Sequence, residues 1–389
     1  MKAAPLPPQS ARPEHALLLA VASSALAPRA GPAPELAGVN WDAFLELAVR
    51  NRLLPHAHRS LEARADVPET VRSRLRARYA ENGRDALRRA AELRRLVGGM
   101  EGAGVRAVAY KGPALAVRAY GHLAMRTYAD LDLLVAPEDV EAAGRVLQDA
   151  GYVSAHRLSP AQEAVFRRVD GDYPYHHPHT GALVELHCHV SSARFCVPLP
   201  TAALIARARP VTIGGGEVPA PADDDLFLSL CLHGAKHRWA RLEWLTAAAA
   251  LAVRAEPDLE AILRRASAIG ARRTVLLALL LARDTLGLPL ADAIHRAIAA
   301  DSVLPALAAE ARGMWFDPRA DAHDTRANLR FNFRLRDGAA DRARFAAHWL
   351  FTPSPEDWAW ARLPDALSPL YRALRPLRLG VRYGLRRGA

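Results

Sequence analysis

The amino-acid sequence predicts an α+β fold, with a small mixed β-sheet between an N-terminal and a C-terminal helical region. Hydrophobic residues make up 51% of the 389 residues but aromatic residues only 6%, and alanine and leucine dominate, which favours helices over an all-β architecture. Hydrophobic spacing changes from helical to short and alternating after Gly102, and becomes helical again near residue 222. A chain of this length exceeds one average domain. We therefore expect helices over 1–102, an α/β core over 103–221, a helical bundle over 222–312 and a basic C-terminal tail region over 313–389.

The first region is expected to be almost entirely helical. Residues 1–12 are rich in proline and are expected to be loose, whereas helices are expected over about 14–27 and 41–63, the second with Asn40 as its N-cap. A long helix from Pro68 to Met100 carries arginines on several faces, which is typical of a solvated helix. The apolar run within 16–31 resembles the core of a signal peptide, but Glu14 and His15 precede it. We therefore expect it to be a buried amphipathic helix.

The middle region alternates strands with helices. Strands are expected at 105–110, 131–135, 152–155 and 183–190, helices at 113–121 and from Pro137 to Gly151, and a glycine-turned hairpin at 210–221. Helices follow from 222 to about 298, with breaks near Pro257, Gly270 and Gly287.

Charge and cysteine content narrow the class of protein. Lysine and arginine total 52 against 41 acidic residues, a formal charge of +11 that suits a phosphate or nucleic-acid partner but is also typical of a chain rich in Ala, Arg and Pro. The three cysteines form no C-x-x-C pair, which argues against a disulfide framework and for a reducing, cytoplasmic compartment. No apolar run reaches the length of a membrane span.

Two aspartates mark the expected site. Asp130 and Asp132 stand at the beginning of a strand, where residues two apart point to the same side. Carboxylates at that range repel unless a cation lies between them, and Mg²⁺ prefers oxygen ligands. A bare pair of this kind is more often two surface acids neutralised by arginines, so the surrounding pattern decides. Glu185, which alternates with two apolar residues on a later strand, is the expected third acid.

The turn between the first strand and the next helix is the expected phosphate site. Lys111 and Gly112 stand in this turn, where backbone N–H groups and a helix N-terminus can hold an anion. The glycines of 214–216 precede no helix and therefore predict a hairpin turn instead.

These motifs together resemble a known family. The pattern "KGPAL…Y…MRTYADLDLLV", a helix ending in "AGY" and then "VELH" is similar to the uncharacterised nucleotidyltransferases of the bacterial polymerase-β-like superfamily, often met near genes for ribosomally made peptides. The resemblance covers about 17–251 and includes "WDAFLELAVRNRLLPHAHRSL" and "LHGAKHRWARLEWL". The assembly of motifs is specific, although each motif alone is weak.

The resemblance implies metal-assisted nucleotidyl transfer from ATP or another NTP. It implies that Asp130, Asp132 and Glu185 hold two Mg²⁺ ions, which activate an acceptor oxygen and stabilise the leaving pyrophosphate. Glu185 is also expected to assist deprotonation of the acceptor. Most of the superfamily has Gly-Ser in this turn, where this chain has Lys111 and Gly112, so Lys111 is expected to contact phosphate directly. Arg126 is expected to brace a phosphate or a carboxylate.

The acceptor stays open at this stage. A natural-product peptide, a small hydroxyl compound and an RNA end all fit the sequence. The family usually carries an aspartate where this chain has Thr246. A catalytically degenerate protein that binds a nucleotide or a peptide within a biosynthetic cluster is therefore the alternative function.

Several histidines are expected near the same cleft. His187 follows Glu185 on its strand, and His233, Lys236 and His237 lie on a helix of the family-like segment, where they are expected near the base, acceptor or phosphate. The pair His233 and His237 lacks the glutamate of a zinc-protease motif, which argues against zinc. Cys188 and the pair Trp239 and Trp244 are expected to be core residues.

Overall fold

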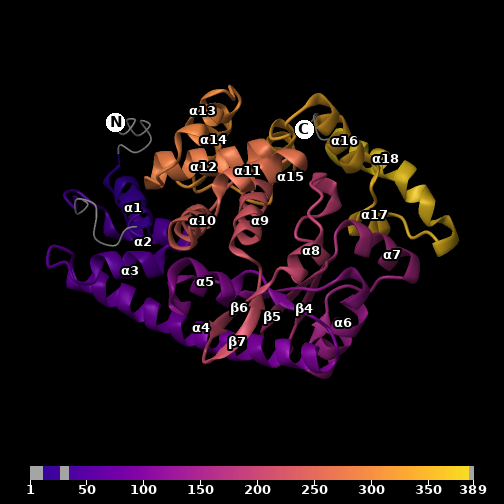
Figure 1. The fold of residues 1–389 in the computed structure, drawn as a ribbon, viewed down its shortest axis with the longest axis horizontal. Helices are drawn as coiled ribbons and strands as arrows, with labels where there is room; N and C mark the ends of the chain where they lie inside the picture. The colour runs from indigo at the N-terminus through magenta and orange to yellow at the C-terminus, as the bar shows by residue number, and fades with distance from the viewer. Residues whose placement is uncertain (1–11, 27–34, 385–389) are drawn as a thin grey trace.

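The computed structural model describes residues 12–26 and 35–384. Figure 1 shows an α+β molecule in which the long helix α4 runs along one edge, below the sheet, while most other helices lie above it. The predicted fold class is therefore confirmed. The proline-rich start predicted to be loose lies outside the described residues except for Arg12.

Four helices build the N-terminal part: α1 (Pro13–Ser23), α2 (Trp41–Arg50), α3 (Leu54–Leu61) and α4 (Glu69–Gly102). Helix α1 buries one side and leaves Pro13 and Ala16 exposed on the other, in line with the expected one-sided burial. The single helix predicted over 41–63 is wrong, because the chain turns between α2 and α3. Arg52 there has a left-handed φ of 56°. Buried Asn51 donates to the carbonyls of Leu47 and Trp315 and accepts from the backbone N–H of Leu242, which fixes the turn.

A five-stranded mixed sheet forms the centre, in the order β1-β2-β5-β4-β3. Only β2 and β5 are parallel; the other neighbours are antiparallel. The predicted hairpin is present and forms a separate two-stranded sheet. The strands are β1 (Val108–Ala109), β2 (Asp130–Leu134), β3 (Val153–Ser154), β4 (Asp172–His176), β5 (Leu183–His187), β6 (Arg209–Ile213) and β7 (Gly216–Ala220).

Short helices connect these strands. Several elements were not predicted: β4, which contains Pro174, the helix α7, which begins at a capping box of Ser159 and Gln162, and the short helices η2, η4 and α8. The connections are α5 (Gly112–Tyr120), η2 (Leu123–Met125), η3 (Pro137–Asp139), α6 (Val140–Asp149), α7 (Pro160–Val169), η4 (Ala193–Phe195) and α8 (Thr201–Ala206).

Two large hydrophobic cores leave one face of the sheet for the site. One core packs Leu131 and Leu133 of β2 and Val184 and Leu186 of β5 against α4 and α6. The alternating residues of both strands therefore point to the opposite face, toward α5 and α9. The other core joins α1–α3 to the helical bundle. The predicted region boundaries at 102, 221 and 312 stay a prediction.

The bundle and the C-terminal part are helical. The chain after residue 312, where no period is evident in the sequence, folds back so that Trp358 packs into the core of the sheet. None of the helices among the described residues is both long and apolar enough to span a membrane. The remaining elements are α9 (Asp223–Lys236), α10 (Leu242–Ala255), α11 (Leu259–Ala268), α12 (Arg272–Leu286), α13 (Asp292–Ala299), α14 (Leu304–Met314), α15 (Thr325–Arg334), α16 (Ala339–Phe351), α17 (Pro355–Trp360), η5 (Asp365–Leu370) and α18 (Tyr371–Gly384).

Candidate functional site

A cavity of about 840 Å³ lies on the free face of the sheet. Its lining comes from β2 and β5, from the β1–α5 turn, from α9 and α10, and from the C-terminal part of the chain. Every residue predicted for the site lines this cavity: Lys111, Gly112, Arg126, Asp130, Asp132, Glu185, His187, His233, Lys236 and His237.

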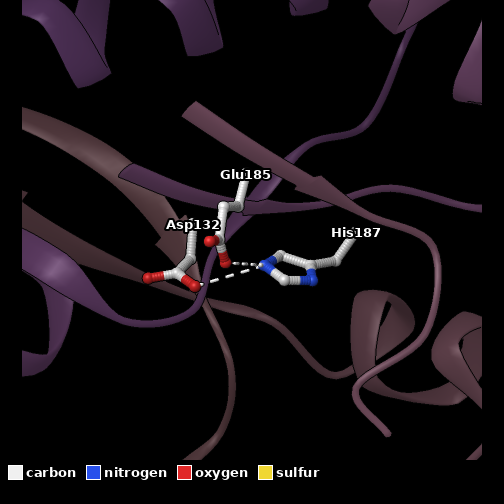
Figure 2. A group of neighbouring side chains, drawn as sticks. All are labelled: Asp132, Glu185 and His187. Carbon is white, nitrogen blue, oxygen red and sulfur yellow. Dashed lines mark hydrogen bonds and ion pairs between the residues drawn. The ribbon is translucent and has the colours of Figure 1, made fainter. Parts of the chain in front are cut away.

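Strand pairing brings the acidic residues together. Because β2 and β5 are parallel and in register, Asp132 lies directly opposite Glu185, and Asp130 lies two residues earlier, opposite Leu183. His187 follows two residues after Glu185 and shares its side of the sheet. Figure 2 shows the side chains of Asp132, Glu185 and His187 converging. Their ligand atoms all lie within 4.8 Å of one another, a group that does not include Asp130.

His187 and Lys111 neutralise this acidic centre. The Nε2 atom of His187 lies 3.2 Å from Asp132 Oδ1 and 3.4 Å from Glu185 Oε2. Its Nδ1 atom lies 3.5 Å from a carboxylate oxygen of Asp172. The ammonium group of Lys111 donates to the same Asp132 oxygen at 2.8 Å.

These contacts fix the ionisation of Asp132 and its partners. Burial alone would raise the pKa of Asp132, but the positive charge of Lys111 and the hydrogen bond from His187 hold it well below its usual value. Burial opposes the charge of Lys111, yet the Asp132 carboxylate holds the pKa of the ammonium well above normal. Asp132 and Lys111 are therefore both charged at neutral pH.

The two other carboxylates differ from each other. Burial and then the negative charges of Asp132 and Glu185 raise the pKa of Asp130. The hydrogen bond with His187 lowers the pKa of Glu185 in spite of its burial. Glu185 is thus held ionised, whereas Asp130 carries repulsion that a nearby cation would relieve.

The donor set fits a divalent cation. Asp132 and Glu185 offer carboxylate oxygens at one point of the cavity, and Asp130 extends the acidic wall. Carboxylate oxygens are the protein ligands that Mg²⁺ prefers. The Lys111 ammonium beside Asp132 shows that the structure already places positive charge there.

The β1–α5 turn has a conformation suited to a phosphate loop. Gly112 begins α5 with φ of +50°, a left-handed conformation that glycine adopts most easily. Gly112, the first residue of α5, therefore presents the N-terminal end of this helix to the cavity beside Lys111.

Arg126 braces a carboxylate, one of the two roles expected for it. Its Nε donates to Glu243 Oε1 at 2.5 Å, and both side chains are buried. The carboxylate of Glu243 holds the pKa of Arg126 above normal although burial lowers it. The buried Nη1 atom of Arg126 has no hydrogen-bond partner among the described residues. The guanidinium of Arg126 therefore lines the cavity but keeps one buried N–H group unpaired.

The histidines of α9 lie in the same cavity. Burial, then the charge of Lys111, lowers the pKa of His233 well below normal, and burial followed by Lys236 lowers that of His237 to about 3. Trp244, expected in the core, lines the cavity, whereas Trp239 is fully buried as expected. Buried Cys188 is also as expected.

Thr246 lies outside the cavity lining of the described chain. It is buried in α10, and its hydroxyl donates to the carbonyl of Leu242 at 2.9 Å. The cavity residue of this helix is Trp244, and its buried acid is Glu243.

Sequence reasoning missed two parts of the site. Glu243 stands within the family-like "RLEWL", but nothing in the sequence pairs it with Arg126, 117 residues away. The second part is the C-terminal wall. The basic stretch near the end of the chain was visible, but its place at the cavity was not. This wall includes Trp349, Glu356, Arg375, Arg378 and Arg382, and Arg194 of η4 lines the cavity as well.

Comparison with known proteins gives one match. A family model described as an uncharacterised nucleotidyltransferase matches residues 37–287, well over half of the chain. The match begins and ends further along than the predicted resemblance over 17–251, and it stops before the C-terminal wall of the cavity. No curated protein matches the chain.

Proposed function

We propose that this chain, which belongs to the uncharacterised nucleotidyltransferase family, transfers a nucleotidyl group from an NTP to an acceptor hydroxyl with the aid of Mg²⁺. The observation that carries the proposal is the convergence of Asp132, Glu185 and His187 in a cavity large enough for a nucleotide and a second substrate.

The acidic centre supplies the metal ligands in this proposal. Asp132 and Glu185, with Asp130 beside them, would hold Mg²⁺. When bound, the metal supplies positive charge to the phosphate oxygens as pyrophosphate leaves. The ammonium of Lys111, which donates to the Asp132 carboxylate, would then also contact a phosphate group of the NTP.

The cationic residues around the turn bind the triphosphate. Gly112, at the N-terminus of α5, and the ammonium of Lys111 line the cavity. Arg126 lines it as well, and Glu243 keeps its guanidinium in place. Lys236 and Arg241 add charge from α9 and from the start of α10.

Glu185 takes the proton of the acceptor. Its lowered pKa keeps the carboxylate ionised, so it can accept a proton from a hydroxyl beside it. His187 orients Glu185 through Nε2 and is itself held by Asp172 through Nδ1. Asp172, His187 and Glu185 thus form one row of contacting charged groups across β4 and β5.

Turnover tests this proposal. Purified protein is incubated with Mg²⁺, each NTP labelled at the α-phosphate, and pools of small hydroxyl compounds, peptides and RNA. Wild type should release pyrophosphate and label one pool, and Asp132→Asn should lose at least ~100-fold of this activity. Asp149→Asn, an exposed change at the end of α6, should leave it unchanged.

Two outcomes would count against the proposal. Equal activity in wild type and Asp132→Asn would place the chemistry elsewhere. Tight NTP binding with no turnover in any pool would support the accessory, non-catalytic role instead.

A further inference from the structure

The cavity has two basic sides and one acidic centre. One side holds Lys111, Lys236 and Arg241, and the other holds Arg194, Arg375 and Arg378. Lys111 lies on Asp132 and lowers the pKa of His233 on α9, which ties the first side to the acidic centre. The second side belongs to η4 and α18, and Figure 1 shows α18, in yellow, to the right of α9 and α10.

Two arginines of α18 share a single carboxylate. Arg375 Nη1 donates to Asp357 Oδ2 at 2.6 Å, and Arg378 Nε donates to the other oxygen of Asp357. Asp357 is 1% exposed and the arginines are 4% and 6% exposed, so water screens this charge poorly. The group keeps one net positive charge at the wall of the cavity.

The same arginines keep donors free. Among the described residues, Arg378 makes no hydrogen bond through Nη1 or Nη2, and Arg375 makes none through Nη2. None of these three nitrogen atoms is among the buried, unpaired polar atoms of the described chain. Arg375 is also fixed over the ring of Trp349 and by the Trp349 carbonyl. The pair is thus a rigid fork whose unused N–H groups fit an oxyanion.

Two other charged residues on this side, Arg194 and Glu356, offer no free donors to an anion. Arg194 is held by both oxygens of Asp170 and by the carbonyls of Thr352 and Pro353. Glu356 lines the cavity beside the fork and stays ionised, since its pKa is lowered in spite of burial. The fork of Arg375 and Arg378 is therefore the part of this wall that offers free donors.

In nucleotidyl transfer, the NTP and the acceptor approach the reacting phosphorus from different sides. The attacking and leaving oxygens lie roughly in line on opposite sides of the phosphorus. If the triphosphate lies on the Lys111 side, the acceptor approaches from the opposite side, where α18 stands. We propose that the acceptor carries an oxyanion, a phosphate or a carboxylate, which Arg375 and Arg378 bind while its hydroxyl faces Glu185.

This inference rests on the proposed function for the placing of the acceptor, but the anion site itself can be tested without turnover. The reaction balances as a simple displacement: the acceptor O–P bond forms, the bond to pyrophosphate breaks, and the hydroxyl proton passes to Glu185. No further co-reactant is needed.

The test is calorimetric titration of the full chain saturated with Mg²⁺ and an NTP analogue that cannot be cleaved between its α- and β-phosphates. Glycerol 1-phosphate, glycerate and glycerol are then added as probes. Glycerol 1-phosphate or glycerate should bind, and glycerol should not. The tighter of the two anions shows whether the site prefers a phosphate or a carboxylate. Arg378→Lys should weaken anion binding about tenfold to a hundredfold because the fork is lost.

Controls separate loss of the site from loss of the fold. Arg372→Gln, an exposed change on the same helix, should leave anion binding unchanged. Arg375→Lys provides a second variant of the fork that keeps its charge, and thermal melting checks that each variant is folded. All variants should bind the NTP analogue as wild type does.

The outcomes distinguish this inference from the function beneath it. Anions that bind no better than glycerol, or that bind folded Arg378→Lys and Arg375→Lys as tightly as wild type, would overturn the acceptor site. Failure of wild type to bind the NTP analogue would instead refute the proposed function, and the anion titration without nucleotide would still test the fork.

Discussion

At the scale of single residues, stability should be especially sensitive to mutation of the buried ion pair of Arg126 and Glu243. Glu243 is fully buried, and Arg126 is its partner at 2.5 Å. Glu243→Gln should lower the free energy of unfolding by about 3 kcal/mol, because it leaves a buried guanidinium without its counter-charge. Denaturant unfolding measures this loss.

Two further variants check the cause. Glu260→Gln removes an exposed glutamate from α11 and should have almost no effect. Combining Glu243→Gln with Arg126→Met should recover part of the lost stability, since the uncompensated charge is then gone. A double variant that is simply the sum of the two losses would contradict this explanation.

His56 makes the protein sensitive to acid. It is fully buried, neither ring nitrogen has a hydrogen-bond partner among the described residues, and burial lowers its pKa to about 3. Between about pH 6.5 and pH 3 the unfolded chain binds a proton at this histidine and the folded chain does not. Stability contributed by the neutral ring is therefore present above pH 6.5 and falls by up to about 1.4 kcal/mol per pH unit below it.

Removing this histidine isolates its share of the acid sensitivity. His56→Leu should flatten the dependence of unfolding free energy on pH between 6.5 and 4, whereas His348→Gln, at an exposed position, should not. Identical slopes in wild type and His56→Leu would show that other groups control the acid response.

At the scale of elements, the β1–α5 turn depends on its glycine. A Cβ at Gly112 would meet the carbonyl of Asp130 at 3.5 Å, an ordinary contact, so the cost of a side chain there comes from the φ of +50° alone. Gly112→Ala should therefore destabilise the protein by about 1 kcal/mol. Gly102→Ala, near the end of α4 with open space and no positive φ, is the matched control and should be neutral or slightly stabilising. Equal unfolding free energies for the two variants would contradict this reading of the turn.

The elements also show what a sequence can and cannot reveal. Asp130, Asp132 and Glu185 were predictable because strand alternation fixes which side chains share a face, and the fold class follows from the same periodicity. Pro55, in the first turn of α3, was a local signal for the break between α2 and α3, but the shape of the turn depends on buried Asn51, which bonds to Leu242 and Trp315 far along the chain. Strand β4 was hidden by Pro174, which argues locally against a strand.

Long-range pairing hid the remaining parts of the site. The partner of Arg126 is 117 residues away, and the fork of Arg375 and Arg378 reaches the cavity only because Trp358 packs into the core of the sheet. Local patterns carry no information on such contacts. The basic composition of the last helix was visible in the sequence, but its position was not.

At the scale of the whole molecule, we expect the fold to be independent of a bound metal. The two large hydrophobic cores contain none of the acidic site residues, and Lys111 and His187 already neutralise Asp132. Chelation with EDTA should therefore leave the melting temperature of the ligand-free protein unchanged while abolishing tight NTP binding. A large drop in melting temperature on chelation would indicate a structural metal instead.

The central claim is that the centre of Asp132 and Glu185 binds an NTP through Mg²⁺, and one measurement tests it without knowledge of the acceptor. An NTP analogue that cannot be cleaved is titrated into wild type, Asp132→Asn and Asp149→Asn, each with and without Mg²⁺. Wild type and Asp149→Asn should bind it at least ~10-fold more tightly with Mg²⁺, and Asp132→Asn should lose that gain. Binding that is independent of Mg²⁺, or equal in wild type and Asp132→Asn, would contradict the account.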